Sequence, residues 1–304
     1  HKLEIDWAEQ VCRLVPCAER VRFFSSGTEA TLMAFRLARS YTRKNKIIKF
    51  QGHFHGWHDY VTIGISPPFH IPVSPGIPAE TLQNTILLPP NDIETVIATV
   101  ESDPDIAGII LEPSGGAYGT VPTRGDFLHQ LREVTAKHGQ VLIFDEVITG
   151  FRLAPGGAQE YYGVKADLAT LAKILAGGFP GGAVAGRNEI LEQFEFRADF
   201  DWNRFQRISH PGTFNANPVS AVAGVVTLKA IATGEETRKA SEMGEKLRFR
   251  LNRVLEELGL PWCVYGHSSL FHFFTQAQDC SVYDSCSREE CLSDATTFAG
   301  GGRG

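Results

Sequence analysis

The segment Ser26-Gly27-Thr28-Glu29 has the residue types that bind an anion at the start of a helix. It follows an apolar stretch and precedes a helical pattern. Successive backbone N–H groups and the positive end of a helix dipole would therefore meet at one point, where a phosphate is stabilised. The same letters also form an ordinary capping box, with Ser26 as the N-cap, which needs no ligand.

A second segment, residues 52–59, is rich in histidine and aromatic residues. Three histidines and Asp59 within it suggest a metal site, but no second Cys/His pair with matching spacing accompanies them. An aromatic platform for a flat ring is at least as good an interpretation. Both interpretations stay open for this segment.

Asp145 and Lys173 each close a short apolar stretch. A carboxylate at the carboxyl end of a buried strand lies where open α/β sheets bind ligands, although it can also cap a helix. A lysine flanked by apolar residues is desolvated, which favours its neutral amine and allows Schiff-base chemistry. The alternative is a buried stem whose ammonium reaches solvent.

Together, these segments provide what pyridoxal 5′-phosphate (PLP) needs. Its phosphate requires a helix N-terminus, its ring a flat cover, its pyridine nitrogen an acid and its aldehyde an amine. A Gly-x-Gly-x-x-Gly turn after the first strand and a Walker-type Gly-Lys-Ser/Thr are both missing from the sequence, which lowers the case for nucleotide binding. The residues therefore predict a PLP site with no metal.

The elements that must position these residues form an α/β pattern. Apolar stretches alternating with amphipathic ones predict a mostly parallel sheet flanked by helices. The expected strands are residues 20–24, 47–50, 106–111, 141–147, 168–171, 183–185 and 270–275. The expected helices are residues 5–14, 29–44, 92–101, 126–138, 218–231 and 235–258.

Composition limits the partners. The 304 residues carry 29 basic and 35 acidic side chains, a net charge of −6, and 43% are hydrophobic. This excludes a disordered chain, and the lack of a dense basic stripe argues against a nucleic acid or an anionic membrane. Six cysteines are few for this length and no signal peptide is visible, so we expect a cytoplasmic protein with a small-molecule substrate.

From about Leu3 to Thr275 the sequence resembles the class III (fold type I) aminotransferases and, within them, the aminomutases that act on glutamate-1-semialdehyde. The motifs that carry the resemblance are Ser26-Gly27-Thr28-Glu29-Ala30, Gly52-x-Phe54-His55-Gly56, Glu112-Pro113, residues 142–152, Gly156-Gly157-Ala158-Gln159, Tyr162-Gly163-Val164, Asp167-Leu168, Lys173 and Pro211-Gly212-Thr213. The resemblance implies the fold type I large domain and PLP as the cofactor.

The resemblance also implies roles for individual residues. Lys173 would form the Schiff base with PLP and carry a proton during the reaction, and Asp145 would pair with the pyridinium nitrogen. Thr213 would reach the cofactor of the neighbouring subunit, which makes a homodimer part of the site. The other cofactor contacts would be Ser26, Gly27 and Thr28 at the phosphate, Phe54 and Val147 on the two ring faces, and Glu112 and His55 close by.

The implied reaction is amino-group transfer through a pyridoxamine phosphate intermediate, by an aminotransferase or an aminomutase. PLP-dependent decarboxylation or racemisation on the same site is an alternative, and a truncated, non-catalytic relative is another. Departures from the family pattern lie at Ser25, at His53 and at residues 114–116. We therefore leave the substrate open.

The resemblance divides the chain into three parts. Residues 1–232 would be the PLP-binding large domain, without the N-terminal segment of the family. Residues 233–275 would begin a small C-terminal α+β domain. Residues 276–304 lose the family pattern and contain Cys280, Cys286 and Cys291, whose spacing is a poor match to a metal site.

Overall fold

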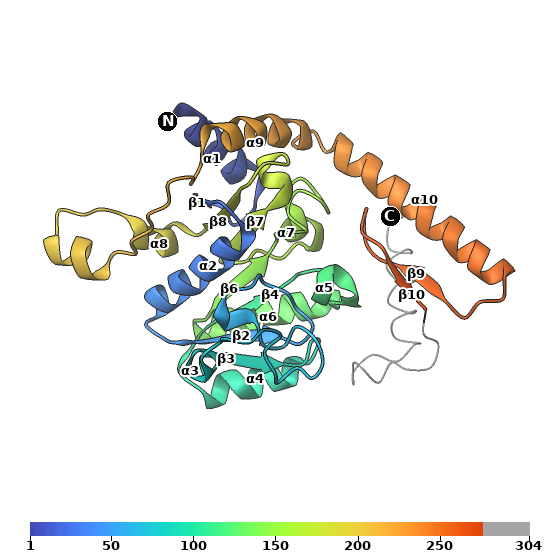
Figure 1. The fold of residues 1–304 in the computed structure, drawn as a ribbon, viewed down its shortest axis with the longest axis horizontal. Helices are drawn as coiled ribbons and strands as arrows, with labels where there is room; N and C mark the ends of the chain where they lie inside the picture. The colour runs from blue at the N-terminus through green and yellow to red at the C-terminus, as the bar shows by residue number, and fades with distance from the viewer. Residues whose placement is uncertain (276–304) are drawn as a thin grey trace.

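Short apolar stretches form the strands of a central seven-stranded sheet (Figure 1). The computed structural model describes residues 1–275. The strand order is β1-β8-β7-β6-β4-β2-β3. The strands are β1 (Arg20–Phe24), β2 (Lys46–Phe50), β3 (Thr85–Leu88), β4 (Ile106–Leu111), β6 (Val141–Asp145), β7 (Leu168–Ala172) and β8 (Gly182–Gly186).

Pairing within this sheet is parallel from β7 to β3, and β8 runs antiparallel to both of its neighbours. Strands β4 and β6 are buried at every position, as expected for parallel strands covered on both faces. The predicted α/β class with a mostly parallel sheet is therefore confirmed.

Helices cover both faces of the sheet. Side chains of α2 pack on one face, together with Ile47 and Ile143, and side chains of α4 and α6 pack on the other, together with Ile48 and Phe144. A third apolar cluster joins α1 and α9 to β7 and β8. The main helices are α1 (Lys2–Leu14), α2 (Gly27–Thr42), α4 (Ile93–Ser102), α6 (Gly125–His138) and α9 (Pro218–Ile231).

Short elements connect these layers. They are α3 (Ala79–Leu82), α5 (Gly116–Gly119), β5 (Val121–Pro122), α7 (Gly157–Tyr162), α8 (Asn188–Leu191), the 3-10 helices η1 (Asp59–Val61), η2 (Lys173–Ala176) and η3 (Glu192–Phe194), and the π-helix η4 (Trp202–Gln206). Among residues 1–275, no helix is long and apolar enough to span a bilayer.

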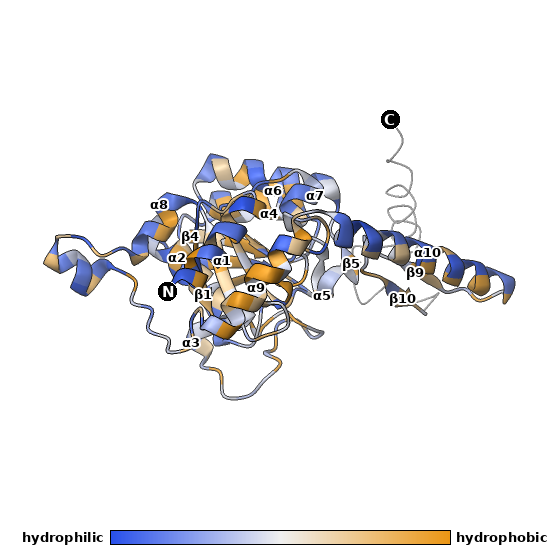
Figure 2. Cartoon of the chain, turned by 90° about the horizontal axis from the view of Figure 1, so that it is seen from above, coloured by the Kyte–Doolittle hydropathy of each residue, from blue (hydrophilic) through white to orange (hydrophobic). Residues whose placement is uncertain are grey.

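After α9, the long helix α10 (Glu235–Glu257) leads away from the sheet (Figure 1). A two-stranded hairpin of β9 (Cys263–Tyr265) and β10 (His272–Phe274) packs against it. The Asn252 side chain of α10 accepts from the backbone N–H of Val264 and donates to its carbonyl, both at 2.8 Å. Figure 2 shows α9 as strongly hydrophobic and α10 with a hydrophilic side. The expected domain boundary near residue 232 stays a prediction, and residues 276–304 with their cysteines lie outside the described residues.

Some details differ from the expected elements, among them the end of β6 and two short strands. β6 ends at Asp145 rather than Val147, because the chain turns there: the Val147 N–H donates to the Asp145 side chain and the Gly150 N–H donates to the carbonyl of Glu146. β3 and β9 were not predicted. Both have four residues or fewer, so each depends on its pairing partner more than on a local pattern.

Candidate active site

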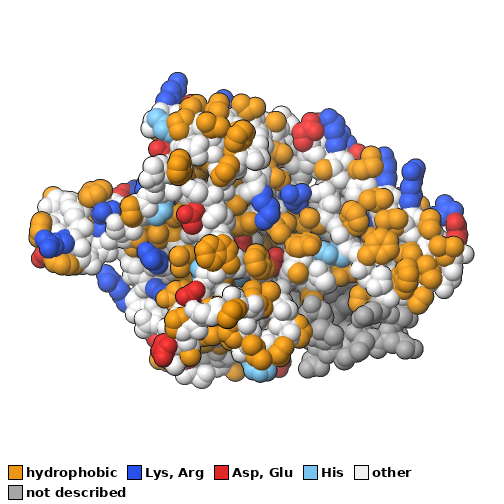
Figure 3. Space-filling view, in the orientation of Figure 1, with side chains coloured by type: hydrophobic (Ala, Val, Ile, Leu, Met, Phe, Trp, Pro, Cys, Tyr) orange, Lys and Arg blue, Asp and Glu red, His pale blue; other side chains and the backbone are white. Residues whose placement is uncertain are grey.

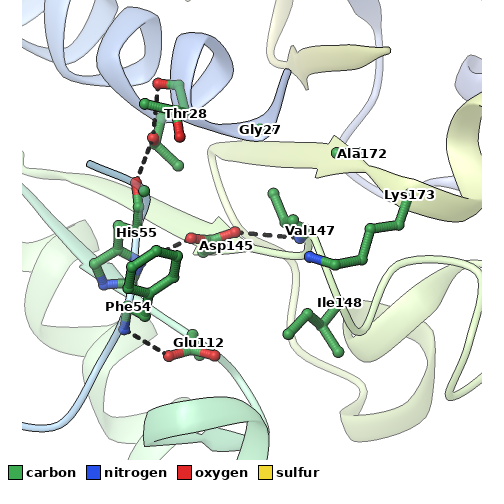
Figure 4. A pocket seen from close by; sticks show the side chains of 12 residues that line it. Gly27, Thr28, Phe54, His55, Glu112, Asp145, Val147, Ile148, Ala172 and Lys173 are labelled. Carbon is green, nitrogen blue, oxygen red and sulfur yellow. Dashed lines mark hydrogen bonds and ion pairs between the residues drawn. The ribbon is translucent and has the colours of Figure 1, made fainter. Parts of the chain in front are cut away.

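A pocket opens where β2, β4, β6 and β7 reach their carboxyl ends (Figure 4). This edge is where open α/β sheets bind ligands. Eight of the ten predicted site residues line the pocket: Gly27, Thr28, Phe54, His55, Glu112, Asp145, Val147 and Lys173. Thr31, Gly56, Ile148 and Ala172 complete the lining and were not predicted. The topology thus brings together residues that are up to 146 positions apart, from Gly27 to Lys173.

The N-terminus of α2 forms one wall of the pocket. The Ser26 hydroxyl accepts the N–H of Glu29 at 3.2 Å, and the Glu29 carboxylate accepts the N–H of Ser25 at 2.9 Å. This is the capping box, so Ser26 holds the helix end and does not line the pocket. The first backbone N–H groups of a helix have no partner within it, and those of Gly27 and Thr28 lie at the pocket.

Close packing at this wall explains two glycines. A Cβ on Gly27 would lie 3.0 Å from the Val147 side chain. Gly56 has φ +98°, and a Cβ there would lie 2.5 Å from the Thr28 hydroxyl. Larger residues would fill the space between α2 and the segment after β2, so the glycines keep the helix N-terminus accessible from the pocket.

Asp145 is buried at the end of β6 and accepts three hydrogen bonds. His55 Nδ1 lies 2.7 Å from its Oδ2, and its Oδ1 accepts the N–H of Val147 at 3.1 Å and the hydroxyl of Thr170 at 3.0 Å. Burial lowers the pKa of His55, while the hydrogen bond to Asp145 opposes that shift. A neutral His55 that donates from Nδ1 therefore holds the carboxylate in place, and sequence alone did not reveal this pairing.

Lys173 is the first residue of η2, directly after β7, and has φ +50°. This left-handed conformation is uncommon for a residue other than glycine, and active sites are among the places where it occurs. Figure 4 shows its side chain extending towards Asp145 and Val147. Partial burial lowers the pKa of Lys173, and the nearby carboxyl groups of Asp145 and Glu112 oppose this shift. A lowered pKa favours the neutral, nucleophilic amine.

Glu112 joins two segments beneath the pocket. Its Oε1 accepts the N–H of Phe54 at 2.8 Å, and its Oε2 accepts the N–H of Tyr118 at 2.9 Å. Its own N–H donates to His53 Nδ1 at 3.0 Å. Burial, together with the nearby Asp145, raises the pKa of Glu112 to about 8. The backbone that carries Phe54 is therefore fixed from below by this carboxyl group.

Replacing Glu112 by glutamine should release one of these segments. A glutamine side chain has one acceptor oxygen and one NH₂ group. The oxygen can accept from the N–H of either Phe54 or Tyr118, and the other N–H then faces the NH₂ group, which cannot accept a hydrogen bond. We expect a loss of about 1–3 kcal/mol in the free energy of unfolding. Amide hydrogen exchange in residues 53–56 or 117–119 should also become faster. Unchanged exchange in both segments would contradict this account of Glu112.

His58 follows the pocket loop and is buried against aromatic rings. It packs edge-on against Phe35 and near Tyr60, and neither of its ring nitrogens has a hydrogen-bond partner. Burial lowers its pKa to about 3. The unfolded chain therefore binds a proton that the folded chain excludes, and stability falls as the pH drops below about 6.5.

His58→Phe should remove the share of this acid sensitivity that His58 contributes, while other buried histidines such as His53 and His267 keep theirs. Between pH 7 and pH 5 the wild type should lose roughly 2 kcal/mol more stability than the variant does. Urea unfolding at the two pH values measures the difference, and His70→Gln, at an exposed histidine, is the control. Equal losses in wild type and His58→Phe would show that His58 is not the responsible group.

Thr213 does not line the pocket. It is exposed, and so is the neighbouring Phe214, with 70% of its surface accessible. The role expected for Thr213 requires a second subunit, so it stays a prediction.

The three histidines of residues 53–58 do not form a metal site: among residues 1–275, no group of three or more histidine, cysteine or acidic side chains is placed to hold a metal.

The fold and the pocket define a class of enzyme. A family model described as "Aminotransferase class-III" matches residues 1–266, so the chain belongs to the class-III aminotransferase family. The likeness to this family noted in the sequence is thereby confirmed.

Individual relatives show which members the chain is similar to. It is 48% identical over 287 residues to a glutamate-1-semialdehyde 2,1-aminomutase from Methanococcus vannielii. The matched region covers 92% of this chain and 65% of that aminomutase. An ω-transaminase structure from Sphaerobacter thermophilus has a TM-score of 0.85 and 36% identity, over 95% of this chain and 67% of that one. A transaminase with PLP bound has a TM-score of 0.82 and 33% identity, over 90% and 63%. The chain thus spans just under two thirds of the length of the aminomutase it matches.

Proposed function

We propose that the chain binds PLP in this pocket and supports the transfer of an amino group. The observation that carries the proposal is the convergence of a lysine amine, a buried carboxylate and a helix N-terminus on one pocket. These are three of the four groups that a pyridine aldehyde phosphate needs, and Phe54 in the same pocket provides the flat cover. The names of the aminomutase and transaminases to which the chain is similar support the same activity.

The pocket residues fit the cofactor. The free N–H groups of Gly27 and Thr28, with the Thr28 hydroxyl, would bind the phosphate at the positive end of the α2 dipole. Phe54 and Val147 would lie on the two faces of the ring. Asp145, fixed by His55, would keep a proton on the pyridine nitrogen. Ser26 would contribute indirectly by capping α2.

PLP, when bound, supplies an aldehyde that amines condense with and a ring that accepts an electron pair. Lys173 would be the amine that holds the aldehyde. Its Nζ, with its lowered pKa, would also accept and return a proton during the reaction. Decarboxylation and racemisation would use the same Lys173 and Asp145, but the names of the relatives favour amino transfer over both.

A cytoplasmic homodimer completes the proposal. Thr213 would reach the cofactor site of the second subunit, as the family resemblance implies. Support comes from the exposed apolar surface beside it, because Phe214 and Val219 are 70% and 56% accessible. Large exposed apolar groups commonly mark an interface. Hydrophobic side chains also gather over α10 and the hairpin in Figure 3.

A half-reaction tests the proposed activity. The protein is incubated with PLP, and the visible absorption of the bound cofactor is followed as single amino acids and amines are added. Amino transfer predicts that at least one donor converts the spectrum to that of pyridoxamine phosphate and releases the matching carbonyl compound. Bound PLP that no donor converts, with carbon dioxide released or the donor racemised instead, would favour the alternative chemistries.

A further inference from the structure

Lys49 is a fully buried lysine that does not line the pocket. It lies on β2 with an exposed fraction of 0%. Ile48 and Phe50, on either side of it, pack on the sheet face covered by α4 and α6. Because side chains alternate along a strand, Lys49 points to the opposite face with Ile47, which packs against α2. Lysine is rarely buried so completely without a specific partner.

The partners of Lys49 are two backbone carbonyls. Its Nζ donates to the oxygen of Val61 at 3.0 Å and to that of Ile63 at 2.6 Å. No carboxylate within residues 1–275 forms an ion pair with it, and Glu112 acts on it only at longer range. Burial lowers the pKa of Lys49 to about 7. The two carbonyls are therefore what this buried amine is placed to bind.

Val61 and Ile63 belong to the returning half of the loop that forms the pocket wall. The loop leaves β2 at Gly52 and comes back to Gly64, where the N–H of Gly52 donates to the carbonyl of Gly64 at 2.8 Å. Phe54 and His55 lie on its outgoing half and line the pocket. Lys49 thus connects the strand to the half of the loop that makes no contact with the pocket.

The outgoing half has its own restraints. Phe54 donates its N–H to Glu112, and the carbonyl of His55 accepts the Thr31 hydroxyl at 2.6 Å. Between the halves, Gly56 packs against Thr28 with almost no free space. A shift of the returning half is therefore transmitted through the turn to Phe54, to His55 and to the helix N-terminus.

We propose that Lys49 is a positioning residue, which fixes the loop of residues 52–64 through the carbonyls of Val61 and Ile63 and so sets the placement of Phe54 and His55. Its consequence for a ligand rests on the proposed PLP function. Without the amine, the buried carbonyl of Val61 loses its donor, and the loop must move to satisfy it. Phe54 and His55 then still line the pocket, but they no longer lie in the positions that fit the PLP ring.

Lys49→Met tests this, because methionine matches the length of the stem and has no donor. Lys46→Met is the matched control: Lys46 lies on the same strand, and its amine pairs with Asp103 at 2.6 Å near the surface. Lys49→Met should raise the dissociation constant of PLP by about tenfold or more and change the visible circular dichroism of the bound cofactor. Lys46→Met should stay within about twofold of wild type, since this ion pair is partly exposed and far from the loop, and ion pairs near the surface contribute little.

A second measurement does not depend on the cofactor. In the protein without PLP, hydrogen exchange of residues 52–64 should be faster in Lys49→Met than in wild type or Lys46→Met. The proposal would be overturned if Lys49→Met had the same hydrogen exchange in residues 52–64, the same PLP affinity and the same circular dichroism as wild type. It would also be overturned if Lys49→Met lost thermal stability with these three properties unchanged. If wild type itself binds no PLP, the proposed function fails and the exchange comparison alone decides the role of Lys49. If Lys49→Met does not fold, Lys49→Gln, which keeps a donor on a shorter stem, is compared in the same way.

Discussion

Replacing Lys173 by alanine should abolish amino transfer and the visible absorption that depends on a lysine-bound cofactor. Among residues 1–275, Lys173 is the one lysine that lines the pocket, so no second amine of the lining can replace it. The rate of amino transfer should fall by roughly three orders of magnitude or more, the scale found when a covalent catalytic group is removed. Absorbance after addition of PLP, and the rate with a donor found in the screen, measure both effects.

The fold should survive this change. Lys173 is exposed, and its amine forms no hydrogen bond or ion pair with another of residues 1–275 that the change would remove. The variant should also still bind PLP without a covalent bond, because the α2 N-terminus and Asp145 remain. Lys137→Ala, at an exposed surface lysine, is the control. Retention of the lysine-bound spectrum in Lys173→Ala would show that another lysine reacts.

Asp145→Asn should lower the rate of amino transfer by about 10²–10³-fold, as is typical when a preorganised electrostatic partner is lost. An amide carries no charge to hold a proton on the pyridine nitrogen. It also presents an NH₂ group to one of the three donors that now contact the carboxylate. Steady-state kinetics with a fixed donor and saturating PLP measure the change.

Asp167→Asn is the matched control for Asp145→Asn. Asp167 is also a buried carboxylate beside the sheet, but it accepts from the Leu142 N–H and pairs with Arg187, away from the pocket. Its replacement should lower stability and leave the spectrum of bound PLP unchanged. If both variants lost activity only in proportion to their stability, Asp145 would have a structural role and no catalytic one.

The parts of the fold that sequence predicted are those with a strong local pattern. Residues 141–145 are an uninterrupted apolar run ending in an acid, which indicates a buried parallel strand and places Asp145 at its end. The periodicity of α2 and its capping residues likewise gave that helix and its free N-terminus. The combined chemistry of these signals predicted one PLP site, and the family resemblance agreed with it.

The parts that sequence missed depend on contacts between distant residues. The sequence predicted a strand that includes Lys49. It did not predict the hydrogen bonds of the Lys49 amine to the carbonyls of Val61 and Ile63, because these depend on the path of the loop. The turn that brings the Tyr118 N–H to Glu112 is left-handed at Ala117 and Tyr118, which are not residue types that favour this conformation. The Asp145–His55 pair joins the end of β6 to the loop after β2, and only the sheet brings these two segments together.

Borohydride trapping tests the central claim most directly. The protein is saturated with PLP, reduced with borohydride and digested, and the modified peptide is identified by mass spectrometry. Reduction makes the bond between cofactor and lysine permanent, so the result records which amine reacted. We predict a single modified residue, Lys173. No stable modification, or modification of other lysines with Lys173 left free, would contradict the assignment of this pocket as a PLP site.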